Sequence, residues 1–179
     1  KGFFEDLDIL KINRQISSYF GLTTTGSDVR PVDPNLFKTE KAHEIQRNAI
    51  KLLKSKFGEH PIWGFKSGGV LRLLPFWESV IQSIPAEPIY VVALRNPLSV
   101  AMSRKNLNPL RGVQEKSDIE WLSRMVPFFR VLRNRRKIIV DYDSLLANPK
   151  HQLKRMANVI GVKITESIAT GMEDYKNNF

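Results

Sequence analysis

The sequence predicts an α/β fold in which helices cover both faces of a central parallel sheet. Apolar runs without polar alternation occur at residues 88–94 and 137–142, and such runs are typical of strands that are covered on both faces. Helical patterns alternate with these runs, which favours right-handed crossovers between parallel strands. The 179 residues can form one domain with its own core, and we expect residues 1–179 to be that domain.

The first part of the chain contains two helical patterns with a loop between them. Apolar side chains recur at helical spacing over residues 7–20. Residues 22–37 contain Thr-Thr-Thr-Gly-Ser and two prolines, which predict a loop. A second helix fits residues 40–57, because Thr39 can cap its first turn and Gly58 can follow its last.

After the second helix the pattern changes to short apolar runs. IWGFK at residues 62–66 predicts a strand, and the Gly68-Gly69 pair predicts a turn. A helix over residues 70–83 then leads to the apolar run at 88–94. We expect the strands at 62–66, 88–94 and 137–141 to lie parallel in one sheet, as neighbours or separated by a strand from outside this set.

Two further helices are indicated in the second half of the chain. SDIE at residues 117–120 has the pattern of a capping box, which predicts the start of a helix. Pro127 predicts a kink or an early restart within that helix. The last helix is expected over residues 147–161, where an Asn-Pro pair can start it and Gly161 can end it.

The composition restricts the partners of the chain. Lys and Arg number 28 against 18 Asp and Glu, so the net charge is +10. This balance favours anionic partners such as phosphate or sulfate esters, nucleotides, nucleic acid or an acidic membrane, and a solvated basic surface is the alternative. The absence of cysteine excludes disulfides and thiolate metal sites and permits a reducing compartment, so we expect a cytoplasmic protein. No apolar run approaches the length of a membrane span.

Arg95 directly follows the apolar run at residues 88–94, at the edge of a parallel sheet where ligands bind. Asn96 can cap a helix that begins at Pro97, and the N–H groups of a helix start suit a phosphate, as does a guanidinium. Ser103 lies about two turns along this helix and reaches the same side only if the helix packs on the strand. The alternative is an arginine that binds helix-end carbonyls and a serine that fits a tight helix contact.

Several segments resemble P-loop sulfotransferases. LRNPLSVAMSR at residues 94–104 resembles their 3′-phosphate-binding segment, in which a strand ends in Arg and a Ser follows eight positions later. IWGFKS and LRLLPFW within residues 62–77 resemble the WGFKDPRTLRLLPFW of bacterial members. KIIVDYDSLLANPKHQLKRMANVIG at 137–161 and GFFED at 2–6 are similar to further family segments, so the resemblance covers most of the chain in order.

The resemblance implies a three-layer P-loop-type fold and a function. Its reaction would transfer a sulfuryl group from 3′-phosphoadenosine 5′-phosphosulfate (PAPS) to an alcohol or amine of a small molecule or glycan, without a metal. By position, Arg95 and Ser103 would hold the donor's 3′-phosphate. Trp121, in the first turn of its expected helix, is the candidate for stacking on adenine, and core packing is the alternative.

The resemblance leaves the catalytic groups open. Lys66, at a strand end, is the candidate cation for the charge that develops on the leaving phosphate, and a simply exposed lysine is the alternative. Glu5 is the candidate base and Asp6 a second one, because carboxylates do this work in some branches of the family. Acidic residues at a helix start also stabilise its dipole. The family's Asp-Pro-Arg is Ser67-Gly68-Gly69 here, which removes the charged residues expected after Lys66.

Two features of the sequence keep alternative functions open. The chain contains no GxxxxGK[ST] phosphate loop, and we expect that loop to precede Lys1 in a longer protein. A non-catalytic relative that keeps the nucleotide-binding fold is therefore an alternative. A basic run over residues 130–137 could bind an acidic acceptor or nucleic acid, or be a solvated helix end. Because no aromatic residues interleave with it, a nucleic-acid-binding protein is the weaker alternative.

Overall fold

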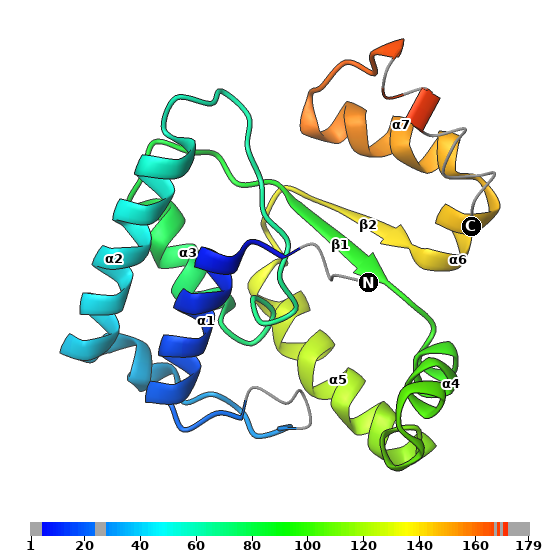
Figure 1. The fold of residues 1–179 in the computed structure, drawn as a ribbon, viewed down its shortest axis with the longest axis horizontal. Coiled ribbons are helices and arrows are strands. Elements are labelled where there is room, and N and C mark those ends of the chain that lie inside the picture. The colour runs from blue at the N-terminus through cyan, green and yellow to red at the C-terminus, as the bar shows by residue number, and fades with distance from the viewer. Residues whose placement is uncertain (1–4, 24–27, 167, 169, 172–179) are drawn as a thin grey trace. The chain divides into compact units, whose positions relative to one another are not determined.

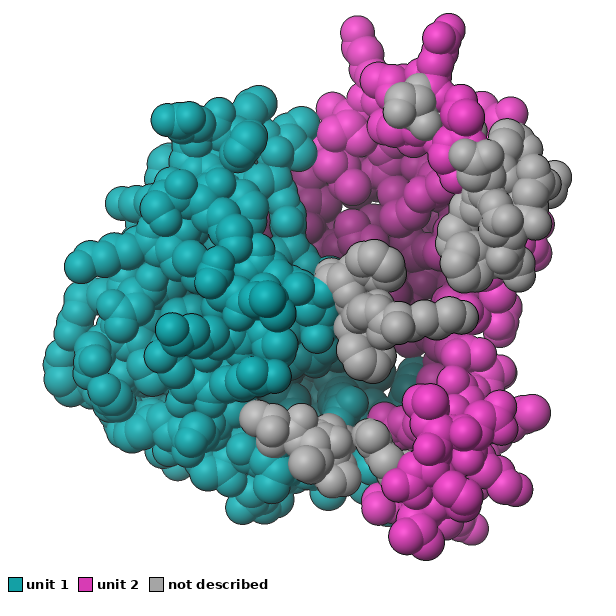
Figure 2. Space-filling model, viewed as in Figure 1, with its two compact units in different colours: residues 1–87, 119–133 teal, residues 88–118, 134–179 magenta. Residues whose placement is uncertain are grey.

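The structure is a computed structural model that describes residues 5–23, 28–166, 168 and 170–171. Residue contacts group the chain into two compact units (Figure 2). Unit 1 comprises Lys1–Glu87 and Ile119–Arg133, and unit 2 comprises Pro88–Asp118 and Asn134–Phe179. The fold is mixed α/β and mostly helical, with one two-stranded parallel sheet within the described residues. None of the helices described is long and apolar enough to cross a membrane.

Unit 1 is helical in its described part. Its elements are α1 (Leu7–Tyr19), the 3-10 helix η1 (Pro34–Lys38), α2 (Glu40–Phe57), α3 (Leu74–Gln82) and the greater part of α5 (Gln114–Val131). Helix α2 packs against both α1 and α3 (Figure 1). The core of the unit is apolar, and its most deeply buried side chains include Ile9, Ile16, Ala49, Leu53, Trp77 and Val80.

The ends of α1 and α2 follow from local side-chain chemistry. The Oγ1 of Thr39 accepts a hydrogen bond from the backbone N–H of Ala42, which confirms the predicted start of α2. Asp6 caps α1 in the same way. The Nζ of Lys56, in the last turn of α2, lies 2.7 Å from carboxylate oxygens of both Asp6 and Asp8, so the end of α2 is joined to the start of α1.

Unit 2 contains the sheet. Strands β1 (Tyr90–Leu94) and β2 (Lys137–Asp141) are parallel, and each residue of β1 pairs in order with one of β2, from Tyr90 and Lys137 to Leu94 and Asp141. The expected parallel relationship between these two runs is therefore confirmed. Helices α4 (Pro97–Leu107), η2 (Pro109–Arg111), α6 (Tyr142–Ala147) and α7 (Pro149–Ile160) complete the unit, together with the start of α5.

The caps predicted for α4 and α7 are confirmed. Asn96 and Asn148 cap α4 and α7, each accepting a hydrogen bond from the first turn. Gly161 ends α7 with φ of 83°, a left-handed conformation that glycine adopts without steric cost. Helix α7 packs on β2, and Ile138 and Val140 of that strand are both buried.

The strand expected at residues 62–66 is not formed. The segment has no regular secondary structure, and half-buried residues alternate with exposed ones along it. Trp63 stacks on Phe57 with ring centroids 4.9 Å apart, and the ring centroids of Phe65 and Trp77 are 5.0 Å apart. Ile62 is exposed. The apolar pattern of the sequence thus correctly indicates that Trp63 and Phe65 are packed against other side chains. A strand also needs backbone hydrogen bonds to a neighbour, and no strand pairs with the segment within the described residues.

The capping box expected at residues 117–120 is also wrong. Helix α5 begins at Gln114, so Ser117 and Glu120 lie inside it. The N–H of Ser117 donates to the carbonyl of Val113, as in a helix interior. The helix continues past Pro127 to Val131, so the expected early restart does not occur. The Ser-x-x-Glu pattern therefore marks two buried positions rather than a helix start.

Candidate functional site

The predicted phosphate-binding arginine lies at the carboxyl end of the sheet. Arg95 is the first residue after β1 and is half-buried. Its guanidinium carbon lies 4.5 Å from the centroid of the Tyr142 ring. Tyr142 directly follows β2, so a cation–π contact joins the ends of the two strands. This contact places a permanent positive charge at the edge of a parallel sheet where ligands typically bind.

Two helices begin beside this strand edge. The Oδ1 of Asn96 accepts a hydrogen bond from the N–H of Leu98 at 2.9 Å, which caps α4. The Oδ1 of Asp141 accepts one from the N–H of Ser144 at 2.8 Å, which caps α6. This backbone hydrogen bond is the largest cause that holds the pKa of Asp141 below its ordinary value. The carboxylate closest to Arg95 in the strand register is therefore engaged in a helix cap.

The structure does not bring Ser103 to Arg95. Ser103 lies two turns into α4 and is half-buried, and no hydrogen bond joins it to Arg95 in the described chain. Figure 1 shows α4 beyond the carboxyl end of β1 rather than folded back along the strand. Helix α4 packs instead against η2. The predicted role of Ser103 in holding the same phosphate as Arg95 stays a prediction.

The two predicted catalytic residues lie in unit 1, around the turn at residues 67–69. The Oε1 of Glu5 accepts a hydrogen bond from the N–H of Gly68 at 2.9 Å, and Lys66 is exposed two residues earlier. The Oγ of Ser67 accepts hydrogen bonds from the Nδ2 of Asn13 at 3.0 Å and from the N–H of Gly69 at 3.4 Å. The structure thus brings Glu5 to the turn that follows Lys66, which the sequence pattern alone does not indicate.

Asn13 is a polar residue that the sequence-based reading does not single out. It is 4% exposed, and its Oδ1 accepts a hydrogen bond from the Nε1 of Trp77 at 2.8 Å. Its amide therefore connects α1, α3 and the turn that holds Glu5. The only sequence signal for Asn13 is that it is a single asparagine among the apolar positions of the helical pattern at residues 7–20.

Trp121, the predicted adenine-stacking residue, is half-buried in the part of α5 that belongs to unit 1.

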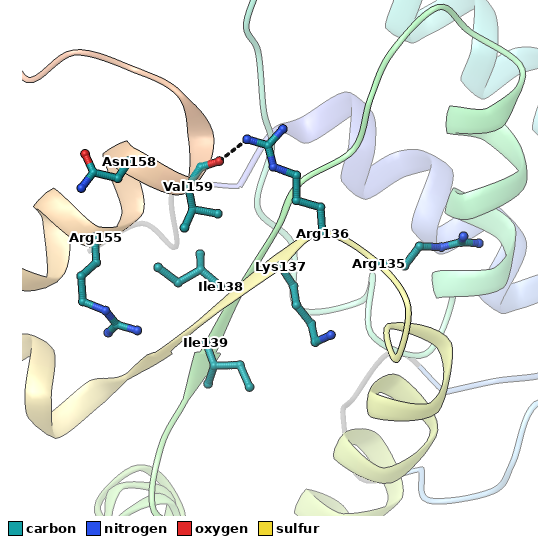
Figure 3. Close-up of a pocket in the computed structure, with 8 residues that line it drawn as sticks. All are labelled: Arg135, Arg136, Lys137, Ile138, Ile139, Arg155, Asn158 and Val159. Carbon is teal, nitrogen blue, oxygen red and sulfur yellow. Dashed lines mark hydrogen bonds between the residues drawn. The ribbon is translucent and has the colours of Figure 1, made fainter.

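A basic pocket lies at the opposite end of β2 from Arg95. It has a volume of about 800 Å³, and its lining contains four cationic residues and no acidic one: Arg135, Arg136, Lys137, Ile138, Ile139, Arg155, Asn158 and Val159 (Figure 3). The side chain of Arg135 points away from α7, and that of Arg136 donates a hydrogen bond to the carbonyl of Val159 at 2.6 Å (Figure 3).

The position of this pocket separates it from the strand-end site. Lys137 is the first residue of β2 and Asp141 the last, so the length of the strand, about 13 Å, lies between the two ends. Arg136 has a structural role, because a cation at the carboxyl end of α7 interacts favourably with the helix dipole. Of the basic run at residues 130–137, Arg136 thus contacts the end of α7, whereas Arg135 and Lys137 belong to the surface of the basic pocket.

The known proteins give no assignment. The chain matched no family model, no curated protein and no solved structure. Within the described residues, no group of three or more His, Asp or Glu side chains is placed to hold a metal ion. A functional assignment therefore depends on the residues of this chain and on their geometry.

Proposed function

We propose that the chain is a sulfotransferase domain, which transfers a sulfuryl group from PAPS to an alcohol or amine. The observation that carries the proposal is the position of Arg95 at the carboxyl edge of β1, over the ring of Tyr142. The sequence around Arg95 supports it independently, because it resembles the 3′-phosphate-binding segment of that family. The partners in this proposal are the nucleotide donor and a small-molecule or glycan acceptor in the cytoplasm.

Arg95 is proposed to bind the donor's 3′-phosphate. A guanidinium that contacts an aromatic ring through its face directs its N–H groups outward in its own plane, where phosphate oxygens can accept them. Helix α4 begins two residues later, at Pro97, and its first turn contributes backbone N–H groups and partial positive charge. Ser103, two turns into α4, is proposed to add a hydroxyl to the same phosphate.

The chemical step is an in-line displacement at sulfur. The acceptor's oxygen or nitrogen forms a bond to sulfur while the bond between sulfur and the bridging phosphate oxygen breaks, releasing adenosine 3′,5′-bisphosphate. We propose Glu5 as the base that takes the acceptor's proton and Lys66 as the cation that stabilises charge on the leaving phosphate. The hydrogen bond from Gly68 holds one oxygen of Glu5 at the turn after Lys66, so the other oxygen can face an acceptor.

The proposal includes a three-layer P-loop-type fold in which further strands extend the β1–β2 sheet. A two-stranded sheet alone is marginal in water. Val91 is 48% exposed and Ile139 is 38% exposed, so apolar positions on both strands have surface for additional packing.

A non-catalytic nucleotide-binding relative is the second candidate. The substitution of Ser67-Gly68-Gly69 for the charged residues of the related segment favours it, because fewer charged groups remain near the proposed base. The two candidates differ in turnover, which can be measured as release of adenosine 3′,5′-bisphosphate from PAPS over a panel of alcohols and amines.

The variants Glu5→Gln and Lys66→Met separate these candidates. For the enzyme, both should reduce turnover strongly while nucleotide affinity is retained, and Lys51→Met, an exposed lysine on α2, should change neither. Nucleotide binding with no turnover on any acceptor would favour the non-catalytic relative. Tight, sequence-selective retention of nucleic acid at physiological salt would instead support a nucleic-acid-binding protein.

A further inference from the structure

Helix α5 exposes an apolar stripe, and its other side buries polar side chains together with Phe128. Ile119, Leu122 and Val126 are 56%, 51% and 46% exposed, and their spacing of three and four residues places them in one stripe along the helix. Ser117 and Glu120 on the other side are fully buried, at 0% and 1% exposure. A surface helix normally shows the reverse arrangement, with its apolar stripe inward. A contiguous exposed stripe of this kind marks an interaction surface.

Charged residues flank the stripe at both ends. Glu115 is exposed four residues before Ile119, and Arg130 is exposed four residues after Val126. Neither side chain forms an ion pair within the described part of the chain. The stripe is therefore bounded by an acidic residue at one end and a basic residue at the other, at equal distances from its apolar positions.

We propose that this stripe is the interface of a homodimer in which α5 of two copies pack antiparallel. Reversing one helix places Ile119 opposite the partner's Val126, and Leu122 beside the partner's Leu122. The same two-fold symmetry places Glu115 opposite the partner's Arg130 at both ends, as a self-complementary interface requires. Antiparallel helices also align their dipoles favourably.

Other arrangements fit the stripe less well. A parallel pair would place Glu115 against the partner's Glu115 and Arg130 against the partner's Arg130, which is repulsive at both ends. A nucleic acid requires a cationic rather than an aliphatic surface. The dimer is a proposal about this helix alone and holds whether or not the chain is a sulfotransferase.

Sedimentation equilibrium over a concentration series tests the dimer. The unsubstituted chain should associate to a dimer, and Leu122→Glu should weaken the association at least about tenfold, because it buries a charge at the symmetry axis. The control Leu7→Glu substitutes another exposed leucine, at the start of α1, and should leave the dimer unchanged. A chain that remains monomeric up to its solubility limit, or a dimer that Leu122→Glu does not weaken, would overturn the proposal.

Charge reversal tests the ends of the interface. Glu115→Arg and Arg130→Glu should each weaken the dimer, since each creates like-charge pairs at both ends. The double variant restores opposite charges across the interface and should recover most of the affinity. Circular dichroism of each variant checks that the helix content is unchanged, so that the rescue reports on association. Failure of the double variant to recover the dimer would overturn the antiparallel pairing.

Cross-linking tests the direction of the helices, because the chain contains no cysteine. A mixture of Ile119→Cys and Val126→Cys proteins should form a disulfide between the two variants on mild oxidation. Each variant alone should not, because seven residues separate like positions by about 10 Å in the antiparallel arrangement, beyond the reach of a disulfide. Self-cross-linking of either variant in place of the mixed product would contradict the proposal.

Discussion

Arg95 and Tyr142 extend the register of the sheet by one residue beyond its last hydrogen-bonded pair. Leu94 and Asp141 are the final partners of β1 and β2, and the next residues of each chain segment contact each other with 4.5 Å between guanidinium carbon and ring centroid. The contact holds the orientation of the guanidinium where α4 and α6 begin. The proposed nucleotide site depends on this geometry.

The ring of Tyr142 should therefore contribute to nucleotide affinity without touching the nucleotide. A cation–π contact at a partly exposed site contributes about 0.5–1 kcal/mol, so Tyr142→Leu should weaken binding of adenosine 3′,5′-bisphosphate about two- to fivefold. Tyr142→Phe keeps the ring and should bind like the unsubstituted protein. Calorimetric titration of the three proteins measures this, and an equal loss for both variants would show that the hydroxyl, not the ring, matters.

The buried amide of Asn13 should stabilise unit 1. Asn13→Leu leaves the indole N–H of Trp77 buried without its acceptor and removes the donor to Ser67, so it should reduce the free energy of unfolding by about 1–3 kcal/mol. Asn48→Leu changes an exposed asparagine of α2 and should alter stability little. Urea unfolding followed by tryptophan fluorescence compares them. Equal stability of both variants would contradict the role of this hydrogen-bond network.

Asp28 should make stability dependent on pH in the acid range. Its buried carboxylate accepts two hydrogen bonds from the side chain of Arg30, which is the largest cause holding its pKa well below the ordinary value. A carboxyl whose pKa is depressed on folding adds stability that is present above about pH 4 and is lost as the pH falls toward the folded-state pKa.

Asp28→Asn should consequently cost about 1–2 kcal/mol at pH 7, at the low end for charged hydrogen bonds because Arg30 is largely exposed. The stability difference between the variant and the unsubstituted chain should shrink below pH 4. Urea unfolding at a series of pH values measures that difference. A deficit of the same size at pH 7 and at pH 3 would show that the loss comes from packing rather than from charge.

Local sequence signals predicted helix ends well. Thr39, Asn96, Asn148 and Gly161 occupy the capping positions that their residue types indicate, because each cap depends only on neighbours within a few residues. The prediction of a strand at residues 62–66 was wrong for the opposite reason. Its alternation is present in the structure, but strand pairing depends on a partner that is distant in sequence.

The candidate site was predictable only in part. Arg95 could be placed at the strand end because the apolar run stops there, and the same rule points to the residues after β2. The contact with Tyr142 depends on the register between the strands, which no local pattern specifies. Likewise, Glu5 and Gly68 are 63 residues apart in sequence, so their hydrogen bond emerges only from the packing of α1 beside the 67–69 turn.

The most direct test of the central claim compares two nucleotides that differ at the 3′ position. Arg95→Ala removes a charged hydrogen bond to the 3′-phosphate and should weaken binding of adenosine 3′,5′-bisphosphate about 10- to 100-fold. Ser103→Ala removes a neutral hydroxyl and should cost less. Affinity for adenosine 5′-monophosphate, which lacks the 3′-phosphate, should change little in either variant. Calorimetric titration that shows equal losses for both nucleotides, or no loss for either, would mean that Arg95 is structural and would contradict the assignment.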